Sequence, residues 1–318
     1  MPYNLPIKQN ELKDTYKLLQ PFIHKTPVIT SRLLNDLAQA DLFFKCESLQ
    51  RTGSFKIRGA TSAVLALSEE QQRRGVVTHS SGNFAQALAF AATQLGVKSW
   101  IVMPENAPDI KKQATAGYGG EIILCKPTIK DRETTALSII EQKGATFIHP
   151  YNQYSVIRGQ STVAMELIED MNHLDYIISP IGGGGLISGI ALACHYFSDK
   201  TKVIGAEPLG ADDAFRSFHT GKLIPQTNPQ TIADGLRTSL GDLTFPIIKE
   251  LVTNIYTVTE TQIMNALKLF WTRTKIIIEP SSAVTLAVVL NNQNIFSNKR
   301  VGVILSGGNI DIDRLFEE

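Results

Sequence analysis

Residues 176–197 read YIISPIGGGGLISGIALACHYF, a strand pattern, a glycine turn and a helix pattern in direct succession. The run Tyr176–Ile181 is short, apolar and rich in β-branched side chains, which predicts a strand buried on both faces. Leu186–Phe197 is apolar over a length that suits a helix. Gly182–Gly185 stand between them. A strand followed at once by a helix is half of the βαβ unit from which parallel sheets are built.

The same alternation of short apolar runs with longer amphipathic runs extends over most of the chain. Because right-handed crossovers place helices on both faces of a parallel sheet, the pattern predicts doubly wound α/β layers. Further strands are expected at Leu42–Lys45, Val76–His79, Ser99–Met103, Glu121–Leu124, Thr146–His149, Val203–Glu207, Ile255–Val258 and Arg300–Leu305. Further helices are expected at Phe84–Leu95, Asp109–Ala116, Arg132–Lys143, Val156–Met171, Thr261–Thr274 and Ser282–Asn291.

Length and composition narrow the class of protein. A chain of 318 residues is long enough for two domains. Lys and Arg number 31 and Asp and Glu number 30, so the basic surface that a nucleic-acid binder needs is not expected. The apolar content of 43% disfavours disorder, and no apolar run is long enough to span a membrane. Met1–Gln20 mixes charged and apolar residues, unlike a secretory signal, so we expect a cytoplasmic protein.

The cysteines and histidines point to no metal cluster. Cys46, Cys125 and Cys194 are odd in number and form no CxxC pair, which argues against a disulfide framework or a zinc cluster. We expect them to be buried thiols. The histidines are scattered and form no HExxH motif, so nothing predicts a catalytic zinc ion.

Gly182–Gly185 are the clearest single signal for a ligand. A run of glycines exposes backbone N–H groups, and the helix start that follows adds more of them together with a favourable dipole. A phosphate is the expected guest. The GK[ST] ending of a Walker A loop is missing, and the third glycine of a dinucleotide fingerprint is replaced by Ile187 or Ser188. A tight turn without a ligand is the alternative interpretation.

Two polar turns follow other predicted strands. Ser80-Ser81-Gly82-Asn83 comes after Val76–His79, and Ser306-Gly307-Gly308-Asn309 comes after Arg300–Leu305. Ligands of open α/β sheets sit at the carboxyl ends of strands, so these turns and the glycine run can face one crevice. Ser and Asn are also favoured helix N-caps, and capping alone would explain either turn.

Lys56 is a candidate catalytic residue. Residues 48–60 read SLQRTGSFKIRGA and place Lys56 between Gly53 and Gly59, beside Phe55 and Ile57. Most lysines are solvated surface groups. Here the flanking glycines allow another group to approach closely, and apolar surroundings would lower the pKa of the amine, as an imine-forming lysine requires.

Ser54–Ala60 resembles the pyridoxal-phosphate lysine motif of the fold type II (tryptophan-synthase β-like) enzymes. The match is specific to their serine/threonine dehydratase and serine racemase family, and it continues in family order through Ser80–Asn83, Gly182–Gly185, Glu207-Pro208, Ala233–Gly235, Glu279-Pro280 and Ser306–Asn309. The resemblance implies two doubly wound α/β domains. A small domain at residues 66–152 would be inserted into a large cofactor-binding domain at residues 1–65 and 153–318. It also suggests a homodimer.

The resemblance implies a role for each matching residue. Lys56 would form a Schiff base with pyridoxal 5′-phosphate (PLP). The other cofactor-binding residues would be Phe55 against the ring, Asn83 on its 3′-oxygen, Gly182, Gly183, Gly184, Gly185 and Leu186 on the phosphate, Glu279, and Ser306 at the ring nitrogen. The substrate carboxylate would be held by Ser80, Ser81, Gly82 and Asn83. A serine hydroxyl does not enforce a protonated ring nitrogen, so Ser306 favours β-elimination over transamination.

The activity implied by the resemblance is β-elimination of L-threonine or L-serine to a 2-oxo acid and ammonia, with Lys56 as general base. Serine racemase activity stays open, because Ser81 matches the serine that acts on the opposite face of Cα in the racemases. A 3-hydroxyaspartate ammonia-lyase stays open too. Arg132 matches a family position near the substrate mouth and could favour an acidic substrate, although an exposed arginine at a helix start is the alternative.

Two residues depart from the family pattern. Phe84 replaces a histidine that usually follows the asparagine, and Tyr151 replaces an asparagine found in animal serine racemases. An inactive, ligand-sensing relative is disfavoured because Lys56 is present. A nucleotide-binding module is the remaining class, and no motif specifies it.

Glu207–Asp213, EPLGADD, resembles the divalent-cation loop of the same subfamily. The resemblance implies carboxylate ligands from Glu207 and Asp213 and a carbonyl ligand from Ala211, with waters completing the shell. Oxygen ligands suit Mg²⁺, Mn²⁺ or Ca²⁺ rather than zinc. An acidic surface loop at a strand end is the alternative.

Overall fold

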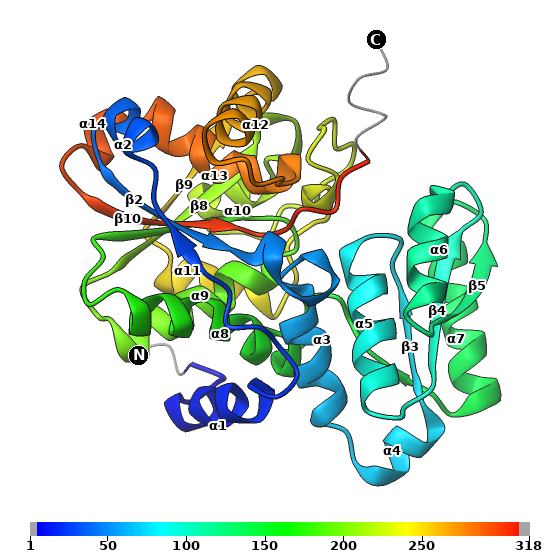
Figure 1. Ribbon diagram of the computed structural model, residues 1–318. Coiled ribbons are helices and arrows are strands. Elements are labelled where there is room, and N and C mark those ends of the chain that lie inside the picture. The colour runs from blue at the N-terminus through cyan, green and yellow to red at the C-terminus, as the bar shows by residue number, and fades with distance from the viewer. Residues whose placement is uncertain (1–4, 312–318) are drawn as a thin grey trace.

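The computed structural model describes residues 5–311 and contains two sheets (Figure 1). The larger sheet has the order β1-β2-β10-β7-β8-β9. All its neighbouring strands are parallel except β1, which pairs antiparallel with β2. Its strands are β1 Val28–Ile29, β2 Asp41–Cys46, β7 Tyr176–Pro180, β8 Lys202–Pro208, β9 Asn254–Val258 and β10 Arg300–Leu305.

Helices cover both faces of this sheet, as the nearly continuous burial of its central strands β7, β8 and β10 requires. Neighbouring strand residues such as Ile177 and Ile178 pack into different apolar clusters on opposite faces. One face carries α2 Arg32–Ala38, α12 Glu260–Thr274, α13 Pro280–Asn291 and α14 Gln293–Phe296. The other carries α1 Gln9–Leu19, α8 Tyr154–Asp170, α9 Gly185–Phe197, α10 Asp213–Thr220 and α11 Thr244–Leu251.

The smaller sheet is entirely parallel, in the order β5-β4-β3-β6. Its strands are β3 Val76–His79, β4 Ser99–Pro104, β5 Glu121–Cys125 and β6 Thr146–Phe147. Val76 and Val77 again pack into clusters on opposite faces. Its helices lie on the right in Figure 1 and are α4 Glu69–Arg74, α5 Asn83–Gln94, α6 Asp109–Gly117 and α7 Ile129–Lys143.

Helix α3, Lys56–Leu65, lies between the two sheets and begins at the candidate catalytic lysine. Its apolar residues, including Ile57 and Ala60, pack with α5 in the core of the smaller sheet. This helix is missing from the sequence prediction, because Gly53, Ser54 and Gly59 weaken the local helix signal. Packing against α5 and α8 supplies the stabilisation that intrinsic propensity lacks.

A buried cluster of charges fixes α3 against its neighbours. The Arg58 guanidinium donates to both carboxylate oxygens of Glu47 and of Glu166, at 2.6–2.8 Å. Lys45 Nζ donates to Glu166 Oε2 at 2.7 Å, so two cations face two anions. Their side chains are at most 1% exposed. Buried charges are tolerated only when they are paired and hydrogen-bonded. These bonds therefore hold Arg58, and with it the first turn of α3, in place against its neighbours.

The predicted fold class, mixed α/β with parallel sheets, is confirmed. Every predicted strand and helix is present, with ends shifted by a few residues, as is usual for element boundaries. The division into domains at residues 66 and 152 stays a prediction. The separate smaller sheet between Val76 and Phe147 supports it, and the chain ends at residues 1–4 and 312–318 lie outside the described residues.

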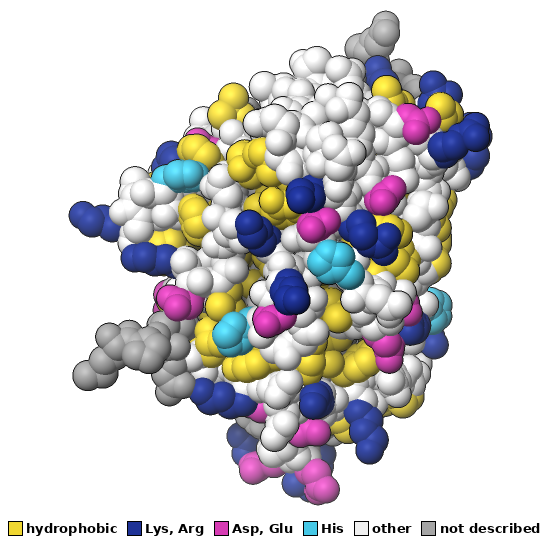
Figure 2. All heavy atoms as spheres, turned by 90° about the vertical axis from the view of Figure 1, so that its left-hand side faces the viewer, with side chains coloured by type: hydrophobic (Ala, Val, Ile, Leu, Met, Phe, Trp, Pro, Cys, Tyr) yellow, Lys and Arg dark blue, Asp and Glu magenta, His cyan; other side chains and the backbone are white. Residues whose placement is uncertain are grey.

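The surface charges and the cysteines agree with what the sequence predicts. Figure 2 shows basic and acidic side chains interspersed on one face, in keeping with 31 Lys and Arg against 30 Asp and Glu. The thiols of Cys46, Cys125 and Cys194 are free and buried, as predicted. Within residues 5–311, no helix is both long enough and apolar enough to cross a membrane.

Candidate active site

The turn that precedes Lys56 is joined by backbone hydrogen bonds to the turn that follows β10. Phe55 N donates to Ser306 O at 3.0 Å, and Gly308 N donates to Gly53 O at 2.9 Å. Ser54 and Gly307 form an isolated antiparallel bridge. Lys56 and Ser306 are 250 residues apart in the chain, and these contacts bring them to one end of the larger sheet.

Lys56 lies in the apolar surroundings that the sequence predicts. Its Nζ is 5.0 Å from the ring centroid of Phe55 and 5.8 Å from that of Phe84, and it donates to Pro150 O at 3.3 Å. Burial lowers the pKa of the Lys56 amine from its ordinary 10.5 to about 8, although the negative charge of Glu279 opposes the shift. The unprotonated amine is the form that attacks a carbonyl or accepts a proton.

The glycine run is closely surrounded, and a side chain would disturb it. A Cβ on Gly183 would lie 2.3 Å from the Tyr151 ring. Gly184 has φ +84°, and a Cβ there would lie 2.8 Å from Thr244 Oγ1. Helix α9 begins at Gly185, so its first N–H groups have no partner within the helix. The loop is therefore a cradle of N–H groups that fits a phosphate.

Asn83 connects the smaller sheet to this end of the larger one. It is the first residue of α5, and its Nδ2 donates to Glu279 Oε1 and Oε2 at 3.1 and 3.0 Å. Burial raises the pKa of Glu279 to about 7, although the hydrogen bond from Asn83 opposes the shift. Ser306 Oγ lies 3.1 Å from Ser282 Oγ, and Ser282 also bonds Gly307.

The polar turn Ser80–Gly82 lies between β3 and α5, and its residues are half-buried. The N-cap of α5 is Gly82, and no side chain caps the helix. Space beside Gly82 is open, because a Cβ there would meet no atom within 4 Å. No described helix follows the Ser306–Asn309 turn. Capping therefore explains neither turn, which leaves both available to ligands.

The predicted metal residues lie together at the end of β8. Glu207 accepts hydrogen bonds from Ala214 N and Phe215 N at 3.0 and 2.8 Å, and Asp213 Oδ2 accepts one from Leu240 N at 2.9 Å. Asp213 Oδ1 is buried without a partner. Burial and the Asp213 charge raise the pKa of Glu207. An unpartnered buried carboxylate oxygen fits a cation.

Residues 19–307 match the model of the family described as "Pyridoxal-phosphate dependent enzyme". The chain belongs to this family. The family supports PLP as the cofactor, and the glycine cradle and the low pKa of Lys56 fit that molecule. Residues that would hold it are Lys56, Asn83, Gly182–Leu186 and Ser306, while the role of each stays a prediction.

Several PLP-dependent enzymes are similar to the chain over nearly its whole length. The solved serine racemase of Dictyostelium discoideum is 48% identical, with a TM-score of 0.92, over 96% of this chain and 99% of that one. The solved threonine deaminase of T.th. is 42% identical, with a TM-score of 0.92, over 96% and 99%. The beta-hydroxyaspartate dehydratase of Paracoccus denitrificans is 48% identical over 94% of this chain and 95% of the relative.

The two residues that depart from the family pattern, Phe84 and Tyr151, lie beside Lys56 and the glycine run. Phe84 is buried and faces Lys56, and its phenyl ring has no hydrogen-bond donor to offer there. The Tyr151 ring lies against the glycine run and 4.6 Å from the His149 ring. Arg132 is only partly exposed, and its Nε is buried without a partner. Arg132 stands near the start of α7, so its position agrees with the alternative of an arginine at a helix start, and its role stays a prediction.

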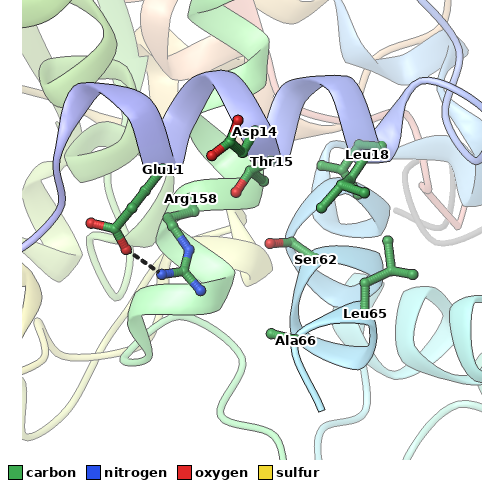
Figure 3. A pocket seen from close by; sticks show the side chains of 9 residues that line it. Glu11, Asp14, Thr15, Leu18, Ser62, Leu65, Ala66 and Arg158 are labelled. Atoms are coloured by element: carbon green, nitrogen blue, oxygen red, sulfur yellow. Dashed lines mark hydrogen bonds and ion pairs between the residues drawn. The ribbon is translucent and has the colours of Figure 1, made fainter. Parts of the chain in front are cut away.

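One cavity lies apart from these residues. It has a volume of about 240 Å³ and opens between α1, α3 and α8, where Arg158 Nη1 donates to Glu11 Oε1 at 2.7 Å (Figure 3). It is lined by Ser62 and Leu65 of the later turns of α3 and by Ala66, which caps that helix. Its lining contains none of the predicted site residues, all of which belong to the described part of the chain.

Proposed function

We propose that this PLP-dependent enzyme eliminates water from a β-hydroxy amino acid, L-serine or L-threonine, and releases a 2-oxo acid and ammonia. The observation that carries the proposal is Lys56, whose amine has a pKa of about 8 and lies among residues that fit PLP. Bound PLP supplies the electron sink for the electrons of the broken Cα–H bond. Lys56 would take the Cα proton, and the β-hydroxyl would leave with one proton as water, so that loss of the Cα hydrogen and the hydroxyl together releases one water; hydrolysis of the enamine product gives the 2-oxo acid and ammonia.

The other residues bind and orient. The Ser80–Asn83 turn offers hydroxyl, amide and backbone donors beside open space, which suits a substrate carboxylate. Ser306 is a neutral hydroxyl already bonded to Ser282, so it brings no negative charge to hold a proton on the ring nitrogen. A weaker electron sink favours rapid loss of the β-hydroxyl over longer-lived carbanion chemistry.

Two alternative activities each have an observation in their favour. For 3-hydroxyaspartate it is the buried, unpartnered Nε of Arg132, because a guanidinium pairs well with a second carboxylate. The Paracoccus dehydratase supports the same substrate. For serine racemisation it is Ser81, which the resemblance places on the opposite face of Cα from Lys56, together with the relatives named serine racemase.

A substrate panel distinguishes these activities. We expect L-serine or L-threonine to give a 2-oxo acid faster than L-serine gives D-serine, measured by keto-acid and chiral amino-acid assays on one sample. Faster formation of D-serine would overturn the elimination proposal. Arg132→Gln tests the acidic substrate: a selective loss of about tenfold or more on 3-hydroxyaspartate would assign that substrate. Arg73→Gln, an exposed arginine, is the control.

We also propose that Glu207, Ala211 and Asp213 hold a divalent cation. Within the described residues, no group of three or more His, Cys, Asp and Glu is placed to share a metal ion. The proposed site therefore depends on two carboxylates, the Ala211 carbonyl and waters, a donor set that suits Mg²⁺, Mn²⁺ or Ca²⁺. The unpartnered Asp213 Oδ1 supports it.

Cation binding should stabilise the folded protein. Saturating Mg²⁺ or Ca²⁺ is expected to raise the thermal midpoint by about 2 °C or more after EDTA treatment, because a ligand of the native state shifts unfolding by mass action. Asp213→Asn should abolish this response, while Asp199→Asn, at an exposed position, should keep it. An equal response in both variants would place the cation elsewhere. The predicted homodimer and cytoplasmic location stay predictions.

A further inference from the structure

The side chain of Asn309 joins three segments of the candidate site. Its Nδ2 donates to Thr52 O at 2.7 Å and to Asn83 Oδ1 at 3.0 Å. Its Oδ1 lies over Gly53, where an added Cβ would be 2.3 Å away. Asn309 therefore connects the turn before Lys56 with the first residue of α5, although 226 residues separate it from Asn83.

These contacts determine which way the Asn309 amide faces. A backbone carbonyl can only accept a hydrogen bond, so the Asn309 atom facing Thr52 O must be the NH₂ group. The same NH₂ group has a second hydrogen, and that hydrogen faces Asn83. The orientation of Asn309 is thus set by a backbone group that cannot rotate.

The orientation of Asn83 then follows. Because Asn309 donates to it, the Asn83 atom on that side must be the carbonyl oxygen, Oδ1. Its NH₂ group faces the opposite side, where Glu279 accepts at 3.0–3.1 Å. An NH₂ group carries two hydrogens, so a donor can serve Glu279 and a ligand acceptor together.

We propose that Asn309 is a positioning residue, which together with Glu279 sets the amide orientation of Asn83, so that Asn83 presents an N–H donor to the cofactor site. The inference rests on the proposed function, in which Asn83 meets the 3′-oxygen of PLP. That oxygen is anionic or strongly hydrogen-bonding, so a donor attracts it and a carbonyl oxygen repels it. In this proposal Asn309 does not contact the ring oxygen itself. It acts by keeping the NH₂ group of Asn83, and not its carbonyl oxygen, on the side of the cofactor.

Asn309 also has a plainly structural role, which a test must separate from this one. Thr52 and Gly53 adopt φ values of 59° and 71°, and Thr52 is not a glycine, so this turn depends on its contacts. Loss of Asn309 would weaken the turn whatever stands at residue 83. Only an effect that depends on Asn83 reports on the amide orientation.

The test is a double-mutant cycle on PLP affinity, measured by titrating apoprotein with PLP and following visible absorbance. Asn309→Asp keeps the shape but replaces the donor with an acceptor, so Asn83 can hydrogen-bond residue 309 only by turning its NH₂ group away from Glu279 and the cofactor site. We expect affinity to fall about tenfold or more with Asn83 present. In the Asn83→Ala background the same change should cost no more than about threefold. Asn228→Asp, on the surface, is the control.

Each outcome decides the matter. Equal losses in both backgrounds, or no loss with Asn83 present, would overturn the inference and leave Asn309 as a support of the turn alone. If Asn309→Asp does not fold, judged by the thermal midpoint of the apoprotein, the cycle with Asn309→Ala gives the same comparison with a smaller expected loss. Wild-type protein that binds no PLP would overturn the proposed function together with the inference.

Discussion

Replacing Lys56 with alanine is expected to lower turnover of the best panel substrate by about a thousandfold or more. The variant should also lose the visible absorbance of the bound cofactor, because no amine remains to capture the aldehyde of PLP. Elimination assays and an absorption spectrum of the purified variant measure the two effects independently. Lys130→Ala, at an exposed position, should change neither.

The pH dependence of cofactor capture provides a sharper form of this test. Only the neutral amine attacks an aldehyde, and burial places the pKa of Lys56 at about 8. Capture of PLP by wild-type apoprotein should therefore accelerate as pH rises through about 8, well below the ordinary 10.5 of a lysine. A midpoint near 10.5 would contradict the lowered pKa of Lys56, and a Lys56→Ala protein that keeps its turnover would remove Lys56 from the mechanism.

The elements that the sequence predicts correctly are those with a strong local signal. Tyr176–Ile181 and Leu186–Phe197 have the composition and length of a buried strand and helix, and they fold as β7 and α9. The glycine run between them interrupts both apolar patterns and suits a turn, because glycine adopts backbone conformations that other residues avoid, so its place at the start of α9 could be inferred without a structure. The glycine and apolar neighbours of Lys56 indicate a reactive lysine independently of the family resemblance, and its catalytic role stays a prediction.

Two features that the sequence prediction lacks, helix α3 and the contacts of Asn309, depend on contacts between distant segments. Helix α3 has a weak local signal, and it forms because Ile57 packs with α5 and Arg58 bonds Glu166, which is 108 residues away. The Asn309 contacts could not be inferred, because a polar residue after a strand is equally consistent with a cap, a turn or a ligand contact. The available signal was the resemblance of the whole Ser306–Asn309 turn to the family, which assigned no role to Asn309 itself.

Gly183 provides the second large effect, through the space beside Tyr151. The Tyr151 ring lies where a Cβ on Gly183 would approach to 2.3 Å, much closer than carbon atoms allow. The ring cannot easily move, because the Tyr151 and Asn152 N–H groups both donate to His149 Nδ1 and the two rings are in edge contact. An added methyl group must therefore displace the glycine run, whose N–H groups are the proposed phosphate ligands.

Gly183→Ala is expected to weaken PLP binding by about 10- to 100-fold, the range that an overpacked buried site predicts. The same apoprotein titration measures it, and Gly117→Ala is the matched control because a Cβ there meets no atom within 4 Å. Combining Gly183→Ala with Tyr151→Ala should restore much of the affinity, since removal of the ring makes room for the methyl group. We expect this rescue because neither substitution removes a backbone N–H group, so relieving the clash returns the donors to their places. If Gly183→Ala binds PLP like wild type, the phosphate is held elsewhere, and the family resemblance of this loop does not extend to its role.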